Sequence, residues 1–182
     1  MQIQIIGAGG VALDILSCFS DEVTFSGIWD DQQPSAWITQ KIPYLGHTDN
    51  IVQSPNTQFI IAIANPLVRK KIFEKNKHLT FKTLIHSSVK LYNPSTIQIE
   101  EGCILMPHVY ITGYVLLAQN VFMHINSGVH HEVQIGAHSV LMPGSRITCA
   151  CNIGLASKLQ TNITISKHIK TSDYQTFNVS EL

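Results

Sequence analysis

The sequence predicts two architectures joined end to end: a small α/β, Rossmann-like domain over residues 1–84 and a parallel β-helix over residues 85–170. Two observations support this division. In the first segment, short apolar runs alternate with helix-like stretches and end in glycine or aspartate. After residue 85, aliphatic residues recur at every sixth position, a period that fits neither a helix nor a flat strand. We predict residues 171–182 as a polar tail that covers or trails from the last coil.

Three apolar runs predict the strands of the α/β domain. The first, residues 3–6, leads into the glycine turn 7–10 and then a helix. The second, residues 23–29, ends at Asp30 and Asp31, and the third covers residues 58–64. Polar groups at the ends of parallel strands can hold a nucleotide-type ligand. A glycine turn can instead serve only helix–strand packing, and an aspartate can be only a helix cap.

The six-residue register predicts the β-helix. Each hexad forms one short strand and one turn, so the aliphatic side chains stack inside the coil. The position four residues after each aliphatic residue is small or branched in nearly every hexad, which suits a bend of the chain. The register is unbroken through Ile99, Leu105, Ile111, Leu117, Met123, Val129, Ile135, Leu141, Ile147, Ile153, Leu159 and Ile165.

Composition excludes several classes of function. Charged residues make up 13% of the chain, and 12 basic residues balance 12 acidic ones without a basic run, so we expect no nucleic-acid partner. We expect no membrane insertion, because no apolar segment approaches the roughly 18 residues that a spanning helix needs. The chain opens on a strand-like run without a basic leader, which favours the cytoplasm. Reduced thiols fit the scattered cysteines Cys18, Cys103, Cys149 and Cys151.

The order of these motifs resembles that of the left-handed β-helix sugar acetyltransferases. This family includes sialic acid O-acetyltransferase and the UDP-4-amino-sugar N-acetyltransferases. The resemblance covers nearly the whole chain and implies a homotrimer that uses acetyl-CoA. The implied acceptor is the 4-amino group of a nucleotide-linked sugar for bacterial surface glycan synthesis. The motifs that carry the resemblance are the turn 7–10, Trp29-Asp30-Asp31, residues 61–65 with Arg69-Lys70-Lys71, His86-Ser87-Ser88-Val89, and residues 126–136.

The resemblance also implies roles for single residues. Ile135-Gly136 fixes the register, which puts the family's catalytic histidine at His131 and its supporting acid at Glu132. A histidine can accept a proton from the acceptor and later donate it to the departing thiolate. We predict coenzyme A contacts at Val140, Gly144 and Ser145, with an oxyanion donor in the 144–145 region. The nucleotide part of the substrate is expected at Gly9, Gly10, Val11, Asp30, Asp31 and Ala64.

Three positions depart from the family pattern. His130 stands where an acid is usual before the base. Val140 stands where a second histidine is usual, and Val11 stands where the glycine turn normally continues with histidine. His130 is open to three interpretations: a solvated side chain, a residue of the trimer interface, or a second proton carrier.

Other functions compete with this interpretation. One is O-acetylation of sialic acid or another sugar hydroxyl, and another is a catalytically degenerate β-helix that only binds a nucleotide sugar. A zinc enzyme of the β-helix carbonic anhydrase type is disfavoured. Its ligand histidines need matching faces, but those near His131 are not a whole coil apart, so we expect no metal. Single histidines on turns are typically solvated, which is our prediction for His108, His124 and His138.

Overall fold

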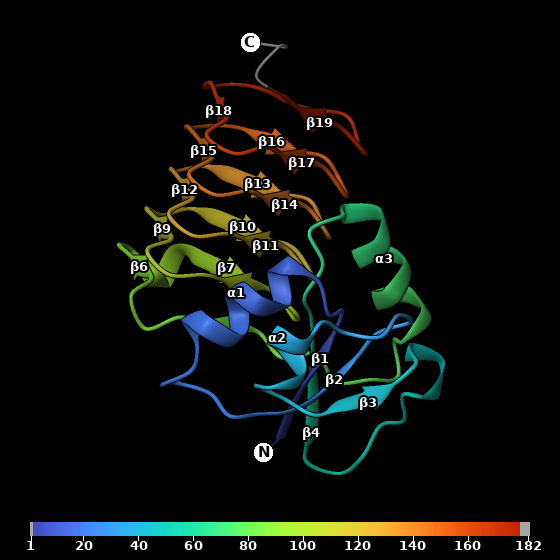
Figure 1. The fold of residues 1–182 in the computed structure, drawn as a ribbon. Coiled ribbons are helices and arrows are strands. Elements are labelled where there is room, and N and C mark those ends of the chain that lie inside the picture. Colours follow the sequence, from blue (N-terminus) through green and yellow to red (C-terminus); the bar gives the residue numbers. More distant parts are fainter. Residues whose placement is uncertain (1, 179–182) are drawn as a thin grey trace.

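The computed structural model describes residues 2–178, and it has the two predicted parts (Figure 1). A parallel sheet with three helices forms the N-terminal domain, and a three-sided stack of coils rises from it to the C-terminal end. The first coil begins with β5 (Leu84–Ile85), at the predicted junction. The predicted fold class is therefore confirmed.

The α/β domain holds one four-stranded parallel sheet in the order β3-β2-β1-β4. The three apolar runs form β1, β2 and β4, as predicted. β3 and α2 were not predicted, because elements of three and four residues are too short to show a period. The elements are β1 (Gln2–Ile6), α1 (Gly10–Cys18), β2 (Phe25–Trp29), α2 (Ala36–Thr39), β3 (Tyr44–Gly46), the 3-10 turn η1 (Thr48–Asn50), β4 (Thr57–Ile61) and α3 (Pro66–Lys75).

The β-helix has three parallel sheets, which we call sheets I, II and III, and most coils give one strand to each. Sheet I contains β5, β8 (Ile104–Leu105), β11 (Phe122–Met123), β14 (Val140–Leu141), β17 (Lys158–Leu159) and β19 (Thr176–Phe177). Sheet II contains β6 (Lys90–Leu91), β9 (Tyr110–Ile111), β12 (Gly128–Val129), β15 (Arg146–Ile147) and β18 (Thr164–Ile165). Sheet III contains β7 (Ile97–Ile99), β10 (Val115–Leu117), β13 (Val133–Ile135) and β16 (Asn152–Ile153), and the 3-10 turn η2 (Pro94–Thr96) precedes β7.

The coil stack extends further than the predicted boundary at residue 170. β19 pairs with β17, so the last described strand lies within the segment that we predicted as a tail. The polar sequence there hid the strand, because an end coil is covered on one side only and can expose more polar residues. Residues 179–182 of the predicted tail lie outside the described residues.

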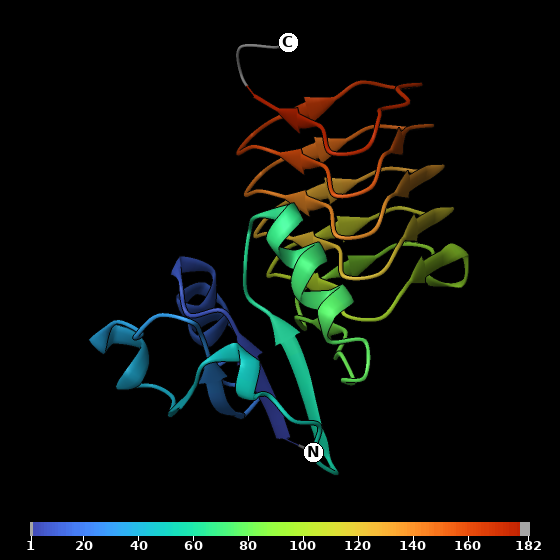
Figure 2. The same ribbon diagram turned by 90° about the vertical axis from the view of Figure 1, so that its right-hand side faces the viewer.

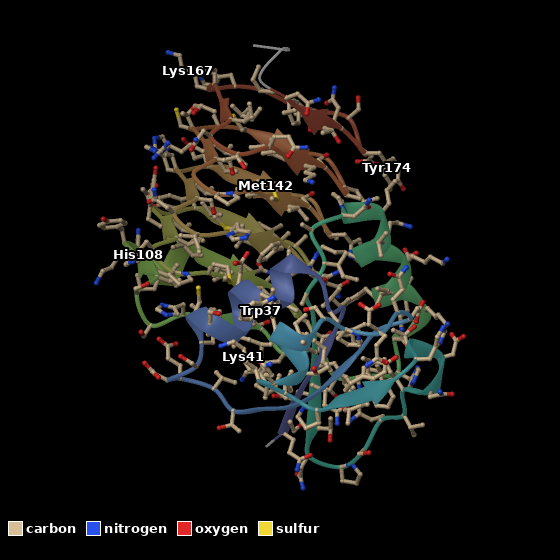
Figure 3. All side chains as sticks on the ribbon, in the orientation of Figure 1. Trp37, Lys41, His108, Met142, Lys167 and Tyr174 are labelled. Atoms are coloured by element: carbon tan, nitrogen blue, oxygen red, sulfur yellow. The ribbon has the colours of Figure 1, made fainter. Side chains whose placement is uncertain are left out.

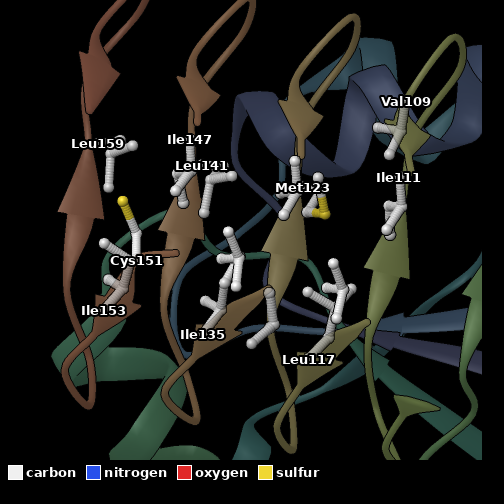
Figure 4. Packing of buried hydrophobic residues seen from close by; sticks show 14 of the residues in the cluster. Val109, Ile111, Leu117, Met123, Ile135, Leu141, Ile147, Cys151, Ile153 and Leu159 are labelled. Atoms are coloured by element: carbon white, nitrogen blue, oxygen red, sulfur yellow. The ribbon is translucent and has the colours of Figure 1, made fainter. Parts of the chain in front are cut away.

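The predicted aliphatic column fills the interior of the coils (Figure 4). Every member from Leu105 to Leu159 is at most 1% exposed. Corresponding residues pair directly between coils, as Met123 does with Leu105 and Leu141. Burial of this continuous column is the main stabilising contribution to the second domain.

A second period of six appears in the backbone and was not predicted. The residue three positions after each aliphatic residue has a φ between 50° and 75°, in the left-handed region. Glycine and asparagine accept this conformation readily, whereas larger side chains are strained there. Large residues at such turns therefore call for a separate explanation. The residues are Gly102, His108, Tyr114, Asn120, Asn126, Glu132, His138, Gly144, Ala150, Ala156, Asn162 and His168. Tyr174, three positions after Thr171, has the same conformation.

The α/β domain packs on the outer face of sheet I (Figure 2). In the first four strands of sheet I, the outward side chains are apolar and buried: Leu84, Ile104, Phe122 and Val140. Beyond them the same column continues with Lys158 and Thr176, which are polar. This change from apolar to polar along a single column marks where the docked domain ends.

Two histidines that we predicted as solvated are buried in this interface. His124 and His138 are each 5% exposed, whereas His108 lies at an exposed turn on the edge of the stack (Figure 3). His138 Nδ1 lies 3.0 Å from the side-chain nitrogen of Asn120, and His124 Nε2 lies 3.3 Å from Asp14 Oδ2 on α1. Docking of the α/β domain covers both rings, an effect that spacing within the hexads cannot reveal.

These buried histidines predict that the fold is sensitive to acid. Burial, together with the positive charge of Arg69, lowers the pKa of His138 from 6.5 to about 4. Between these values the unfolded chain binds a proton that the folded chain does not, so stability is complete above pH 6.5 and is lost as the pH falls towards 4. We expect His138→Asn to reduce the fall in melting temperature between about pH 7.5 and about pH 5.

The matched control for this experiment is His108→Asn, at an exposed turn of the same backbone conformation. It should leave the acid-induced fall in melting temperature unchanged. An equal fall in the His138→Asn variant and in the wild type would show that other groups cause the acid sensitivity.

Candidate active site

A pocket of about 500 Å³ opens at the carboxyl ends of the α/β sheet. Its apolar lining residues are Ile6, Ile63, Val68 and Ile72. Its polar residues come from the ends of β1, β2 and β3 and from α3. A pocket that is partly apolar and partly polar suits a flat ring that carries hydroxyl and phosphate groups. The polar and turn residues are Gly7, Asp30, Asp31, His47, Thr48, Asp49, Lys71 and Lys75.

The two predicted aspartates have different tasks in this pocket. Asp30 accepts hydrogen bonds from the backbone N–H of Ala8 at 2.6 Å and of Gln32 at 2.9 Å, so both of its oxygens are engaged. It therefore fixes the glycine turn. Asp31 accepts from the backbone and hydroxyl of Thr48 with Oδ1 alone, and these bonds lower the pKa of Asp31. Its Oδ2 accepts no hydrogen bond from the described residues and can accept one from a ligand.

The cations of the pocket also differ. Lys75 pairs with Asp49 across the rim. Lys71, on the exposed face of α3, makes no ion pair or hydrogen bond with any described residue. An unpaired ammonium group at the rim of a pocket can bind an anionic group such as a phosphate.

The glycine turn leaves open space in front of α1. A Cβ atom added at Gly9 or Gly10 would meet nothing within 4 Å, and no side chain caps the helix. The free N–H groups of this first turn can bind an anion. Gly7 is required for a different reason, because its φ is 100° and a Cβ atom would lie 2.5 Å from Ile63. The other two predicted nucleotide contacts, Val11 and Ala64, are partly buried against the core that joins the two domains.

His131 and Glu132 lie together on the turn between β12 and β13. His131 Nδ1 lies 2.9 Å from Glu132 Oε2, and the side chains are 54% and 64% exposed. Because the carboxylate can only accept, we assign the proton to Nδ1, which leaves the Nε2 lone pair free. A cavity of about 280 Å³ is lined by these two residues and Tyr114. The pair therefore offers an oriented base to an open space.

His130 is separated from this pair. Its ring packs edge-on against Tyr110, with 5.9 Å between the ring centroids. The residue is partly buried, and its ring nitrogens make no hydrogen bond with the described residues. The neighbouring Gly128 makes room for Tyr110, since a Cβ atom there would lie 2.1 Å from the phenol ring. His130 is thus a packing residue on sheet II in the single chain, and its role as a proton carrier stays a hypothesis.

The predicted coenzyme A residues offer no free polar group. The Gly144 N–H donates to Ile125 O and the Ser145 N–H to Met142 O, both at 3.1 Å. Val140 is fully buried on the outer face of sheet I, below the α/β domain. Neither amide can therefore act as the predicted oxyanion donor, because both already bond within the coil.

A free backbone donor lies elsewhere, one coil beyond His131. Ala150 N–H donates to His131 O at 3.1 Å, which stacks the turn of Cys149 directly on the turn of His131. The N–H of Cys149 donates to no group in the described chain. The signal for it was present in the sequence, since Cys149 follows His131 by one coil of three hexads.

The base and the pocket lie on different sides of the chain. The α/β domain covers sheet I, whereas His131 occupies the corner between sheets II and III. In a three-sided coil that corner is opposite sheet I. No group of three or more metal-ligating residues occurs within residues 2–178, and no helix there is long and apolar enough to span a membrane.

Comparison with protein-family models matches residues 2–76 to the PglD N-terminal domain. Among solved structures, PerB from Caulobacter crescentus, in complex with CoA and GDP-perosamine, has a TM-score of 0.65 at 17% identity, over 93% of this chain and 91% of that one. WeeI from Acinetobacter baumannii AYE has a TM-score of 0.67 at 20% identity, over 94% of each chain. The acetyltransferase domain of PglB from Neisseria gonorrhoeae FA1090 has a TM-score of 0.61 at 16% identity, over 94% and 96%.

These matches cover both parts of the chain, in the order in which they occur. The solved structures share its fold over nearly their full length, and the family model adds a sequence match for the α/β domain. The resemblance inferred from the sequence is confirmed at the level of the fold: residues 2–76 match the model of the PglD N-terminal domain, and the α/β domain followed by a β-helix is shared with these solved structures.

Proposed function

We propose that this protein transfers an acetyl group from acetyl-CoA to the amino group of a nucleotide-linked 4-amino sugar, with His131 as general base. The observation that carries the proposal is the exposed His131–Glu132 pair beside an open cavity. The similar PerB binds CoA and GDP-perosamine, and two structures of that enzyme carry a substitution at one histidine. The reaction would take place in the cytoplasm, where acetyl-CoA is available.

The chemistry follows from the orientation of the His131 ring. Nε2 removes a proton from the amine as its nitrogen attacks the thioester carbonyl. Glu132 accepts a hydrogen bond from Nδ1–H of His131 and stabilises the imidazolium that forms. A C–N bond forms, the C–S bond then breaks, and the same proton passes from Nε2 to the departing thiolate.

The carbonyl oxygen gains negative charge during this attack and needs a hydrogen-bond donor. The N–H of Cys149 is suited to this task, because it is unengaged and belongs to the turn stacked on His131. We assign the thioester to the Cys149 side of the base. Loss of such a donor typically slows acyl transfer about 100-fold to 1,000-fold.

The nucleotide would bind in the pocket of the α/β domain. The apolar residues from β1 and α3 contact the nucleobase, and Asp31 accepts a hydrogen bond from a ribose hydroxyl or from an N–H of the nucleobase. Lys71 and the free N–H groups at Gly9, Gly10 and Val11 bind the diphosphate. Ala64 lies three residues beyond the end of β4 and outside the lining of the pocket.

A homotrimer would bring the two half-sites together. Since the pocket and His131 lie on opposite sides of one chain, a sugar held by one subunit must reach the base of a neighbour. Rotational symmetry repeats this contact and completes three identical sites.

The test is thiol release from acetyl-CoA in the presence of a panel of acceptors. We expect release with nucleotide-linked 4-amino sugars and no release with free sialic acid. Release with sialic acid alone would instead identify an O-acetyltransferase. No release with any acceptor, together with tight binding of a nucleotide sugar, would identify a binding protein without catalysis and contradict the proposal.

A further inference from the structure

We propose that Tyr114 is the surface on which the acceptor sugar stacks beside the base, an inference that rests on the proposed function. Tyr114 is one of the three residues that line the cavity at His131, and it is 66% exposed. It lies one coil before Glu132, to which it is linked by the bond from Glu132 N–H to Gly113 O at 3.2 Å. Its ring therefore lies on one side of the catalytic pair.

Tyr114 occupies the left-handed turn position of its hexad. Its φ is 53°, a strained value for an aromatic residue at a position where glycine or asparagine is preferred. Thr96 Oγ1 accepts a hydrogen bond from its backbone N–H at 2.9 Å, but the phenol hydroxyl has no partner among residues 2–178. Tyr174 shares this backbone conformation and exposure, but of these two rings only that of Tyr114 lines the cavity at His131.

The two sides of His131 differ in the groups that they offer. On the Cys149 side a backbone N–H is free, which suits the thioester oxygen. On the Tyr114 side the N–H of Gly113 is likewise unengaged by the described residues, but this side also presents the exposed ring of Tyr114. We therefore assign the acceptor sugar to the side with the ring and the acetyl donor to the Cys149 side.

The position of the α/β domain agrees with an acceptor sugar on the Tyr114 side of His131. The domain docks on β5, β8, β11 and β14, the early part of the coil stack. In a cyclic homotrimer, a neighbour's nucleotide pocket lies at the same height. Tyr114 follows β9 in one of these early coils, so a sugar that extends from the neighbour reaches Tyr114 on its way to His131.

The chemistry of a pyranose ring matches this surface. One face of the ring carries mainly C–H groups, which pack against the face of an aromatic side chain. Such stacking fixes the plane of the sugar and directs its 4-amino group to His131 Nε2. A phosphate or a carboxylate would gain nothing from the same contact.

The experiment is steady-state kinetics of acetyl transfer with a UDP-linked 4-amino sugar. Tyr114→Ala should raise KM for the sugar about 10-fold with KM for acetyl-CoA unchanged, since one stacked ring is worth about this much. Tyr114→Phe should retain the wild-type KM, because it keeps the ring. Tyr174→Ala is the matched control, with a φ of 62° and 54% exposure at the turn between β18 and β19 (Figure 3).

Binding measurements separate this inference from the proposed reaction. In calorimetry with the intact oligomer, the UDP-linked sugar should bind more tightly than UDP alone, and Tyr114→Ala should remove that difference even if no turnover occurs. The inference would be overturned if Tyr114→Ala raised KM for acetyl-CoA and left KM for the sugar unchanged. A loss in Tyr114→Phe equal to that in Tyr114→Ala would also overturn it, as would a change in oligomeric mass that accounts for the effect.

Discussion

Replacement of His131 by alanine is expected to abolish acetyl transfer while the fold and nucleotide binding persist. General base catalysis is typically worth about 100-fold to 10,000-fold in rate, and no other described group supports His131 in this role: its one partner is Glu132. The side chain is 54% exposed and carries no packing role, so the melting temperature should stay within about 2 °C of the wild-type value. The measurement is thiol release from acetyl-CoA at saturating acceptor.

Two further variants make this result specific. Glu132→Gln keeps a hydrogen-bond acceptor but not the charge, so it should slow transfer less than His131→Ala. His130→Ala should cost much less, because that ring packs against Tyr110 and not against the cavity. Undiminished activity in His131→Ala would contradict the assignment of His131 as the base. A larger loss of activity in His130→Ala than in His131→Ala would instead indicate that His130 is the base.

Replacement of Arg69 by alanine is expected to lower the free energy of unfolding by about 3–5 kcal/mol. Arg69 is fully buried in the interface between α3 and the coils. Its guanidinium group donates to Ile61 O, Ile63 O, and both the backbone and side-chain oxygens of Asn120. Removal leaves these oxygens buried without a donor, and it also leaves a cavity.

Replacement of Arg69 should also make the two domains unfold in separate transitions. Arg69 joins the end of β4 to a β-helix turn, so the α/β domain of the variant should melt before the coils in calorimetry. Burial lowers the pKa of Arg69 to about 9, so the group is still charged at neutral pH. Lys70→Ala is the control, since Lys70 only makes a surface pair with Glu74. Equal stability of the two variants would contradict this role of Arg69.

The interior of the fold was predictable because it depends on a local rule. A period of six places each aliphatic residue inside the coil whatever its neighbours are, so the column from Leu105 to Leu159 could be named in advance. No information about the rest of the molecule was needed for this prediction. The resemblance named Glu132 as the supporting acid, but the contact between its side chain and His131 could not be read from the sequence, because neighbouring side chains on one turn can also point apart.

The remaining features depend on contacts between distant segments. His124 and His138 are buried only because α1 and α3 pack over them. The amides of Gly144 and Ser145 are engaged by carbonyl groups, and backbone bonds of this kind leave no trace in side-chain identity. One signal was available and was missed: Leu84, Ile104, Phe122 and Val140 are apolar at a position that is usually polar in the other two sheets.

The docking of the α/β domain on the early coils has an evolutionary consequence. Coils interact only with their immediate neighbours, so the later ones can be gained, lost or altered without disturbing the nucleotide pocket. The early coils and their docked domain would retain the choice of acceptor, while the later coils vary in the thioester that they admit. A chain of this design can change its donor and its acceptor by separate mutational steps.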